Sequence, residues 1–164
     1  MHILHNIIGV PKITQNNSSD NSAVFTMGPL PRGYGVTLAN SLRRVALSSI
    51  PGTKVTGIKV KGVSHEYSTL PGIKDSVVDI MLNLKGLVVD KTDTGIEWLK
   101  LSKKKAGAVT AADITLPSGI KILNPEMYIT EIDQDKLELD IEIRIEKGVG
   151  YMSNEDLKER EDDV

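Results

Sequence analysis

The chain contains no cysteine, and only 4% of its 164 residues are aromatic. The absence of thiols excludes a disulfide framework and metal sites built from thiolates. With so few aromatic side chains, the core must consist of Ile, Val and Leu. Because 40% of the residues are nevertheless hydrophobic, the composition predicts a folded globular protein with one or two small domains.

Neither sign of charge is in large excess, and no long hydrophobic run is present. Lys and Arg total 20 and Asp and Glu total 22, a net charge of -2. This balance argues against a chain whose whole surface binds nucleic acid. The mildly apolar segment 1–10 is too short to span a membrane and lacks the basic flank and cleavage site of a signal peptide. We therefore expect a soluble, cytoplasmic protein with no membrane partner.

Two elements are predicted in the first third of the chain. The polar, turn-forming residues 15–22 separate two short apolar runs, 7–13 and 23–27, which we expect to pair as a hairpin. A helix is expected from Gly35 or Thr37 to Ser49, before Pro51-Gly52. Its apolar stripe at helical spacing consists of Leu38, Leu42, Val45 and Ala46, and we expect Ala39 and Leu47 to widen it.

The remainder of the chain indicates one more helix and several strands. A strand is expected over Val55–Val63. Apolar residues then recur at helical spacing from Ile73 to Leu84, with Pro71 in the first turn and Gly86 at the end. Further strands are expected at Ile96–Leu101, Ile120–Leu123 and Lys136–Glu146. The last of these alternates between apolar and charged residues, which predicts one buried and one solvated face. The fold class is α+β, with a mostly antiparallel sheet.

No motif gives convincing support for catalysis. Arg32-Gly33-Tyr34-Gly35 precedes a helix, but Leu38 occupies the position of the third glycine in a dinucleotide-binding loop. His65-Glu66 begins like a zinc-protease motif, yet Thr69 stands where the second histidine is required. Asp75 and Asp79 are expected one turn apart on a helix, and Asp90 and Asp93 in a turn, all as solvated carboxylates. We predict no catalytic residue, no metal ligand and no cofactor in this chain.

Five segments in order resemble the alpha subunit family of bacterial DNA-directed RNA polymerase. The longest is Gly-Pro-Leu-Pro-Arg-Gly-Tyr-Gly-Val-Thr-Leu-Ala-Asn-Ser-Leu-Arg-Arg-Val-Ala-Leu-Ser-Ser-Ile-Pro-Gly at 28–52. The others are Gly-Val-Ser-His-Glu-Tyr-Ser-Thr at 62–69, Asn-Leu-Lys-Gly-Leu at 83–87, Val-Thr-Ala-Ala-Asp-Ile at 109–114 and Gly-Val-Gly-Tyr at 148–151. Together they extend the resemblance over roughly residues 24–152.

The resemblance implies a dimerisation domain, incomplete here, into which a mostly antiparallel α+β domain is inserted. Residues 1–51 would be the first half of the dimerisation domain, 52–152 the inserted domain, and 153–164 an acidic linker or truncated end. The stripe Leu38, Leu42, Val45 and Ala46 would pack against a second alpha subunit. From the residues alone, the alternative is that this stripe faces a core within the chain.

The resemblance also implies contacts with the large polymerase subunits. Arg44 and Leu47, together with His65, Glu66 and Tyr67, would contact the beta subunit, and Lys85 the beta′ subunit. Arginine suits such a contact because its planar fork pairs bidentately with a carboxylate. The alternative for Arg43 and Arg44 is a favourable interaction with the helix dipole, and an exposed lysine at a helix end is ordinary.

The implied function is that of a non-catalytic subunit in a nucleotidyltransferase complex that transcribes DNA into RNA. The catalytic magnesium would be held by other subunits, and DNA would be contacted only through the complex or a carboxy-terminal domain not present here. A truncated gene or a naturally split subunit would explain the length. The alternatives are a stand-alone dimeric adaptor and a small-molecule enzyme. We expect 1–51 to expose apolar surface and 52–152 to be the better-folded part.

Overall fold

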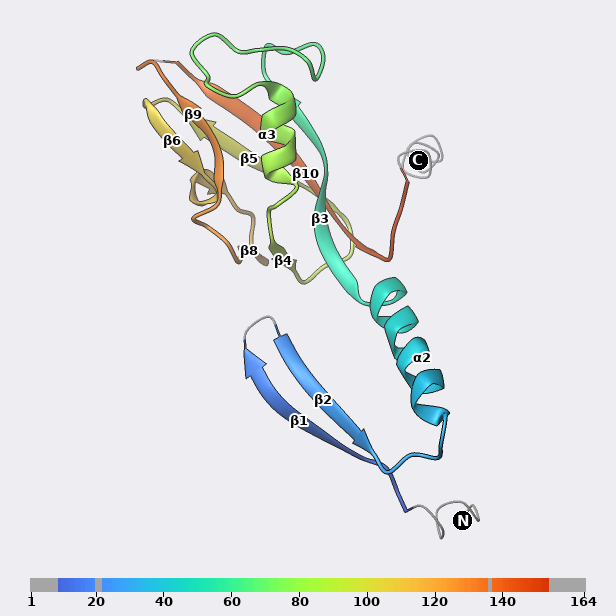
Figure 1. Ribbon diagram of the computed structural model, residues 1–164. Coiled ribbons are helices and arrows are strands. Elements are labelled where there is room, and N and C mark those ends of the chain that lie inside the picture. Colours follow the sequence, from blue (N-terminus) through green and yellow to red (C-terminus); the bar gives the residue numbers. More distant parts are fainter. Residues whose placement is uncertain (1–8, 20–21, 136, 154–164) are drawn as a thin grey trace. The chain divides into compact units, whose positions relative to one another are not determined.

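The computed structural model describes residues 9–19, 22–135 and 137–153. The chain divides into two compact units between Ile50 and Pro51. Figure 1 shows a hairpin and one helix in the first unit, and a curled sheet with one helix in the second. The predicted α+β class is confirmed.

The first unit consists of a two-stranded antiparallel hairpin and the helix that follows it. Strand β1 (Lys12–Ser19) pairs with β2 (Ser22–Gly28), and helix α2 runs from Tyr34 to Ser48. The predicted hairpin and first helix are thus both present. The polar residues from Gln15 onward, predicted as a turn, instead lie largely in β1, because backbone pairing with β2 does not require apolar side chains.

The second unit is built on a six-stranded antiparallel sheet in the order β7-β5-β10-β3-β4-β8. Its strands are β3 (Pro51–Val60), β4 (Val89–Lys91), β5 (Ile96–Lys103), β7 (Ile114–Thr115), β8 (Ile120–Ile122) and β10 (Leu139–Val149). A separate pair joins β6 (Gly107–Thr110) to β9 (Tyr128–Ile132), with the short helix η1 (Ala111–Asp113) after β6. Helix α3 (Val77–Leu84) contributes Ile80 and Leu84 to the buried core of this unit.

Strand β10 is the central strand of this unit. The predicted alternation holds, since Leu139, Ile141, Ile143 and Ile145 are all buried. The strand pairs with β3 along one edge and with β5 along the other. It begins at Leu139 and continues to Val149, beyond the predicted end at Glu146. Lys136, the predicted start, lies outside the described residues.

The second helix is shorter than predicted. Ile73 is not helical but forms an isolated bridge with Ile132. Ser76 caps the helix: its hydroxyl accepts from the Asp79 N–H at 3.3 Å, and its own N–H donates to Asp79 Oδ2 at 3.2 Å. This reciprocal cap fixes the start of α3 at Val77, although the apolar spacing extends back to Ile73. The predicted pair of helical carboxylates is therefore wrong, because Asp75 precedes the helix.

Two other predicted boundaries are also corrected. The strand expected over Val55–Val63 ends at Val60, because the chain turns at Gly62, whose φ of 83° is accessible mainly to glycine. Asp90 was expected in a turn but lies in strand β4, where it is opposite Lys121 of β8.

A partly buried ion pair joins the end of β5 to Asp113, the last residue of η1. The Lys103 ammonium donates to Asp113 Oδ2 at 2.7 Å and to the Ala108 carbonyl at 2.8 Å, and the Thr110 N–H donates to the same carboxylate oxygen at 2.9 Å. Partial burial by itself raises the pKa of Asp113. The hydrogen bonds from Lys103 and Thr110 outweigh it, so the pKa lies below its usual value of 3.8.

We predict that Asp113→Asn lowers the free energy of unfolding by about 1–2 kcal/mol at pH 7, because charge-assisted hydrogen bonds are lost. A carboxyl whose pKa is depressed in the folded state stabilises the protein above its unfolded pKa, and this contribution is lost as the pH falls through the folded pKa. The difference in free energy of unfolding between the variant and the unchanged protein should therefore become smaller below pH 3.8. Urea titrations at a series of pH values measure it. Asp93→Asn, at an exposed position, is the matched control. A difference that does not change with pH would refute the ion pair's contribution.

The two units are predicted to differ in amide hydrogen exchange. Helix α2 has no buried residue, whereas the inward face of β10 is fully buried. In dilute solution, amides of α2 should exchange faster than those of Ile141–Ile145 by at least about two orders of magnitude. Strong and equal protection in both units would contradict this expectation.

Candidate protein-docking site

Helix α2 is fixed locally by its backbone and by serine side chains. Gly33 precedes the helix with a φ of 83°, a conformation that side-chain-bearing residues rarely adopt. The hydroxyls of Ser41 and Ser48 donate to the carbonyls of Thr37 and Arg44, at 2.9 and 2.8 Å. The Ser49 N–H donates to the Val45 carbonyl at 3.0 Å and closes the last turn. The helix therefore forms without burying any of its side chains.

The stripe predicted for dimerisation is largely exposed. Leu42 and Val45 each retain 57% of their accessible surface, Ala46 is exposed, and Leu38 is half-buried. The alternative that this stripe faces a core within the chain does not hold for the described residues. The prediction that the first unit exposes apolar surface agrees with these values.

Arg44 and Leu47 lie on a different side of α2. At about 100° per residue, they fall about 150° from the centre of the stripe formed by Leu38, Leu42, Val45 and Ala46. Leu47 is 65% exposed, and Arg44 belongs to none of the ion pairs found in the described part of the chain. Arg43 and Arg44 both precede the last turn of the helix. This position weakens the alternative that the two arginines are there to interact with the helix dipole. Within the part of the chain that the structure describes, the helix thus presents two separate faces that no other element covers.

The segment His65–Tyr67 belongs to the long connection between β3 and α3. The Ser68 N–H donates to the His65 carbonyl at 3.1 Å, and Ser68 Oγ lies 3.2 Å from His65 Nδ1. The Val77 N–H in turn donates to the Ser68 carbonyl at 3.2 Å. These bonds attach the segment to the start of α3 while His65, Glu66 and Tyr67 stay exposed, Tyr67 at 77%.

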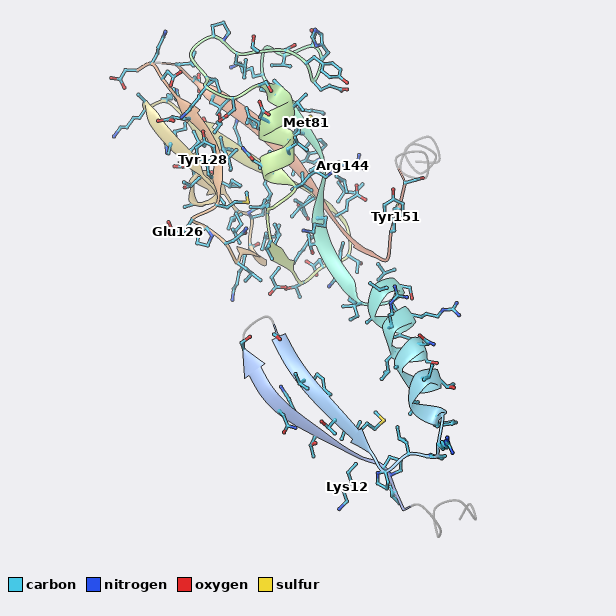
Figure 2. The ribbon with its side chains drawn as sticks, in the orientation of Figure 1. Lys12, Met81, Glu126, Tyr128, Arg144 and Tyr151 are labelled. Carbon is cyan, nitrogen blue, oxygen red and sulfur yellow. The ribbon has the colours of Figure 1, made fainter. Side chains whose placement is uncertain are left out.

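The end of this connection is held against β9. The Tyr128 hydroxyl donates to Asp75 Oδ2 at 2.7 Å, and Lys74 forms an ion pair of the same length with Glu131. Figure 2 shows Tyr128 among the side chains of β9. Desolvation of the hydroxyl, followed by the bond to the Asp75 carboxylate, raises the pKa of Tyr128 to about 12. The phenol therefore remains protonated and donates to Asp75 across the neutral range.

An open groove of about 410 Å³ lies beside this connection. His65 and Glu66 line it together with residues 57–60 of β3 and with Val77 and Met81 of α3. Figure 2 labels Met81 on α3, near the upper part of β3. The structure thus places two of the predicted site residues, His65 and Glu66, in one concave surface. Sequence reasoning had missed Met81 and the strand residues, which carry no recognisable motif.

Lys85 caps the carboxyl end of α3. Its N–H donates to the Met81 carbonyl at 3.1 Å, and its side chain is exposed. The chain that follows is fixed by Asn124, whose side-chain amide donates to the Gly86 carbonyl at 3.0 Å and whose oxygen accepts from the Val88 N–H at 2.9 Å. Lys85 therefore stands at the end of α3 away from His65 and Glu66.

The arrangement of the described residues also bears on metal binding and on membrane insertion. Within residues 9–19, 22–135 and 137–153, no group of three His, Asp or Glu side chains is placed to hold a metal ion. No helix in those ranges is long and apolar enough to cross a membrane. What the described residues offer is exposed apolar and charged surface, the kind used in protein contacts.

Residues 58–163 match the family model of the RNA polymerase Rpb3/RpoA insert domain. The chain belongs to this family. It is 47% identical over 145 residues to a DNA-directed RNA polymerase subunit alpha of Roseiflexus sp. (strain RS-1), a match that covers 88% of this chain and 45% of that protein. It is also 48% identical over 143 residues to the DNA-directed RNA polymerase subunit alpha of Leifsonia xyli subsp. xyli. This match covers 87% of this chain and 43% of that protein.

A third relative is the DNA-directed RNA polymerase subunit alpha of Syntrophomonas wolfei subsp. wolfei, which is 43% identical over 150 residues. This match covers 92% of this chain and 47% of that protein. The chain therefore spans slightly less than half the length of these curated relatives. The resemblance stated from the five sequence segments is confirmed, and the insert-domain match coincides with most of the second unit.

Proposed function

We propose that the chain acts as the assembly platform of a DNA-directed RNA polymerase, dimerising and recruiting the two large subunits. The observation that carries this proposal is that α2 exposes apolar residues on two sides and has no buried residue. Relatives at 43–48% identity are named as polymerase alpha subunits, which favours this proposal over a stand-alone adaptor.

Dimerisation is assigned to the stripe Leu38, Leu42, Val45 and Ala46. Burying one such aliphatic side chain contributes about 1.5–3 kcal/mol. In a symmetric dimer every residue is buried twice, so a few exposed positions supply enough free energy for a stable pair. The first unit, residues 1–51 in this proposal, is then the dimerisation domain, and residues 52–152 are the inserted domain.

Recruitment of the beta subunit is assigned to Arg44 and Leu47 in one unit and to His65, Glu66 and Tyr67 in the other. The guanidinium of Arg44, which pairs with no carboxylate among the described residues, provides a planar fork for one on the partner, and Leu47 adds exposed apolar area beside it. The 65–67 segment is held by backbone hydrogen bonds, so little conformational entropy is lost when a partner covers it. Lys85 is assigned to the beta′ subunit.

The chain itself supplies no catalytic group in this proposal. Nucleotide chemistry and its magnesium belong to the large subunits, and the platform acts in the cytoplasm, where it contacts DNA only through the assembled complex. Its contribution to transcription is to hold the large subunits in one particle. The residues that matter are therefore those whose loss changes assembly.

Arg44→Ala is predicted to weaken capture of the beta subunit by about tenfold to hundredfold, the cost of losing a charge-assisted contact. The alpha dimer should be unaffected, because Arg44 lies far around the helix from the stripe. Co-purification of the chain with the beta subunit from the same organism measures the capture of beta, and sedimentation measures the dimerisation of alpha. Arg32→Ala, at another exposed arginine, is the control.

Loss of the dimer with undiminished capture of beta would reverse the assignment of the two faces. Failure of the unchanged chain to capture beta at all would overturn the proposed function.

Leu42→Ser combined with Val45→Ser is predicted to weaken dimerisation at least about hundredfold, because each apolar side chain is lost from both copies. Sedimentation equilibrium over a range of concentrations measures the change. The control is Val36→Ser, which removes a 68% exposed valine from the side of α2 facing away from the stripe. Equal weakening by the control would show that the stripe is not the interface.

A further inference from the structure

One edge of β3 is free along most of its length. β10 pairs with the strand from Pro51 to Val60. On the other edge, β4 pairs with it only at Thr53, opposite Val89. Within the residues that the structure describes, no strand covers this edge from Lys54 to Val60. A free edge presents unpaired N–H and C=O groups and is a template for another strand.

The backbone groups at this edge can be identified. The Lys61 N–H donates to the Asp140 carbonyl at 3.1 Å, so Lys61 and Asp140 form a hydrogen-bonded pair that continues the β3–β10 ladder. Such pairs alternate with non-hydrogen-bonded ones in an antiparallel ladder. The register is regular from Gly57 to Val60. The N–H groups of Ile58 and Val60, and the carbonyl of Ile58, therefore point away from β10.

The groove described above lies along this same edge. Four consecutive residues of β3, Gly57 to Val60, line it. Successive residues of a strand face opposite sides of the sheet, so a hollow lined by four in a row follows the strand edge rather than one face. Val77 and Met81 of α3 form its apolar wall, and Met81 is 39% exposed. The groove thus combines a strand template with apolar surface for alternate side chains.

The charges along the edge select the kind of strand it accepts. Lys54, Lys59 and Lys61 are exposed and take part in none of the ion pairs found among the described residues. Lys59 is directed away from this edge, because its ammonium lies 4.7 Å from the centre of the Trp98 ring of β5, on the far side of β10. Pairing with a second copy of β3 would set lysine against lysine, which is unfavourable, whereas acidic residues opposite them are favourable.

We propose that the free edge of β3 takes up an extended segment of a large polymerase subunit, in which apolar residues alternate with acidic ones. The segment forms backbone hydrogen bonds with Ile58 and Val60. Its apolar side chains enter the groove against Val77 and Met81, and its carboxylates face Lys54 and Lys61. This inference takes the identity of the partner from the proposed function. It adds a mode of binding, strand addition, and the chemistry of the added segment, neither of which follows from the contacts assigned to Arg44 and to residues 65–67.

Hydrogen exchange of the chain alone and in complex with the beta and beta′ subunits of its organism tests the inference. The amides of Ile58 and Val60 should exchange at least about tenfold more slowly in the complex, since they gain strand partners. A complex that forms without this slowing overturns strand addition and leaves the proposed function standing. If no complex forms, the proposed function fails and the inference fails with it.

Charge reversal distinguishes pairing at the edge from indirect protection. Lys54→Glu with Lys61→Glu should weaken capture of the large subunit about tenfold and abolish the slowing at Ile58 and Val60. Lys12→Glu with Lys105→Glu makes the same charge change at two exposed lysines outside β3 and its neighbouring strands and should leave both measurements unchanged. Equal effects of the two double variants would show that net charge, and not the β3 edge, governs binding.

Discussion

The second unit depends on the burial of one face of β10. Its alternating isoleucines can be buried only if strands lie on both sides and an apolar layer covers the inward face. β3 and β5 provide the flanks, and α3 with β9 contributes to the cover. One strand whose side chains alternate strictly thereby fixes the register of its neighbours, since a slip by one residue would turn every isoleucine toward water. The edge of β3, the groove and the 65–67 segment all take their positions from this ladder.

Residues 9–19 and 22–50 of the first unit show no equivalent constraint. Its hairpin and helix satisfy their backbone hydrogen bonds locally, yet Leu42, Val45 and Leu47 remain exposed, as do Val24 and Phe25 of β2. Exposed apolar patches of this kind are typical of surfaces that contact other polypeptides. The contrast between the two units is therefore physical: among the described residues, the second unit has a closed apolar core, and the first leaves large apolar side chains exposed.

The sequence predicted those features that arise from strong local periodicity. The alternation from Leu137 to Ile145 identified the central strand, and the spacing of Leu38, Leu42 and Val45 identified α2. Sequence patterns did not predict the element boundaries that are set by a few polar atoms or by one glycine. Ser76 and Asp79 cap α3 and exclude Ile73 from the helix, and Gly62 ends β3 before Val63. The short strands β6, β7 and β9 have patterns too brief to distinguish from loops, and their pairing depends on contacts distant in sequence.

The residues of the candidate site likewise fall into those that could be predicted from the sequence and those that could not. Arg44, Leu47 and His65–Tyr67 came from a resemblance to a family, and the structure adds that they are exposed. The free edge of β3 was not predictable, because a strand's sequence does not state how many neighbours it has. Exposed lysines such as Lys54 and Lys61 are a common means of protecting a strand edge from aggregation. The same charges that keep two copies of this edge apart also make it selective for an acidic strand, so protection and recognition are here two consequences of one arrangement.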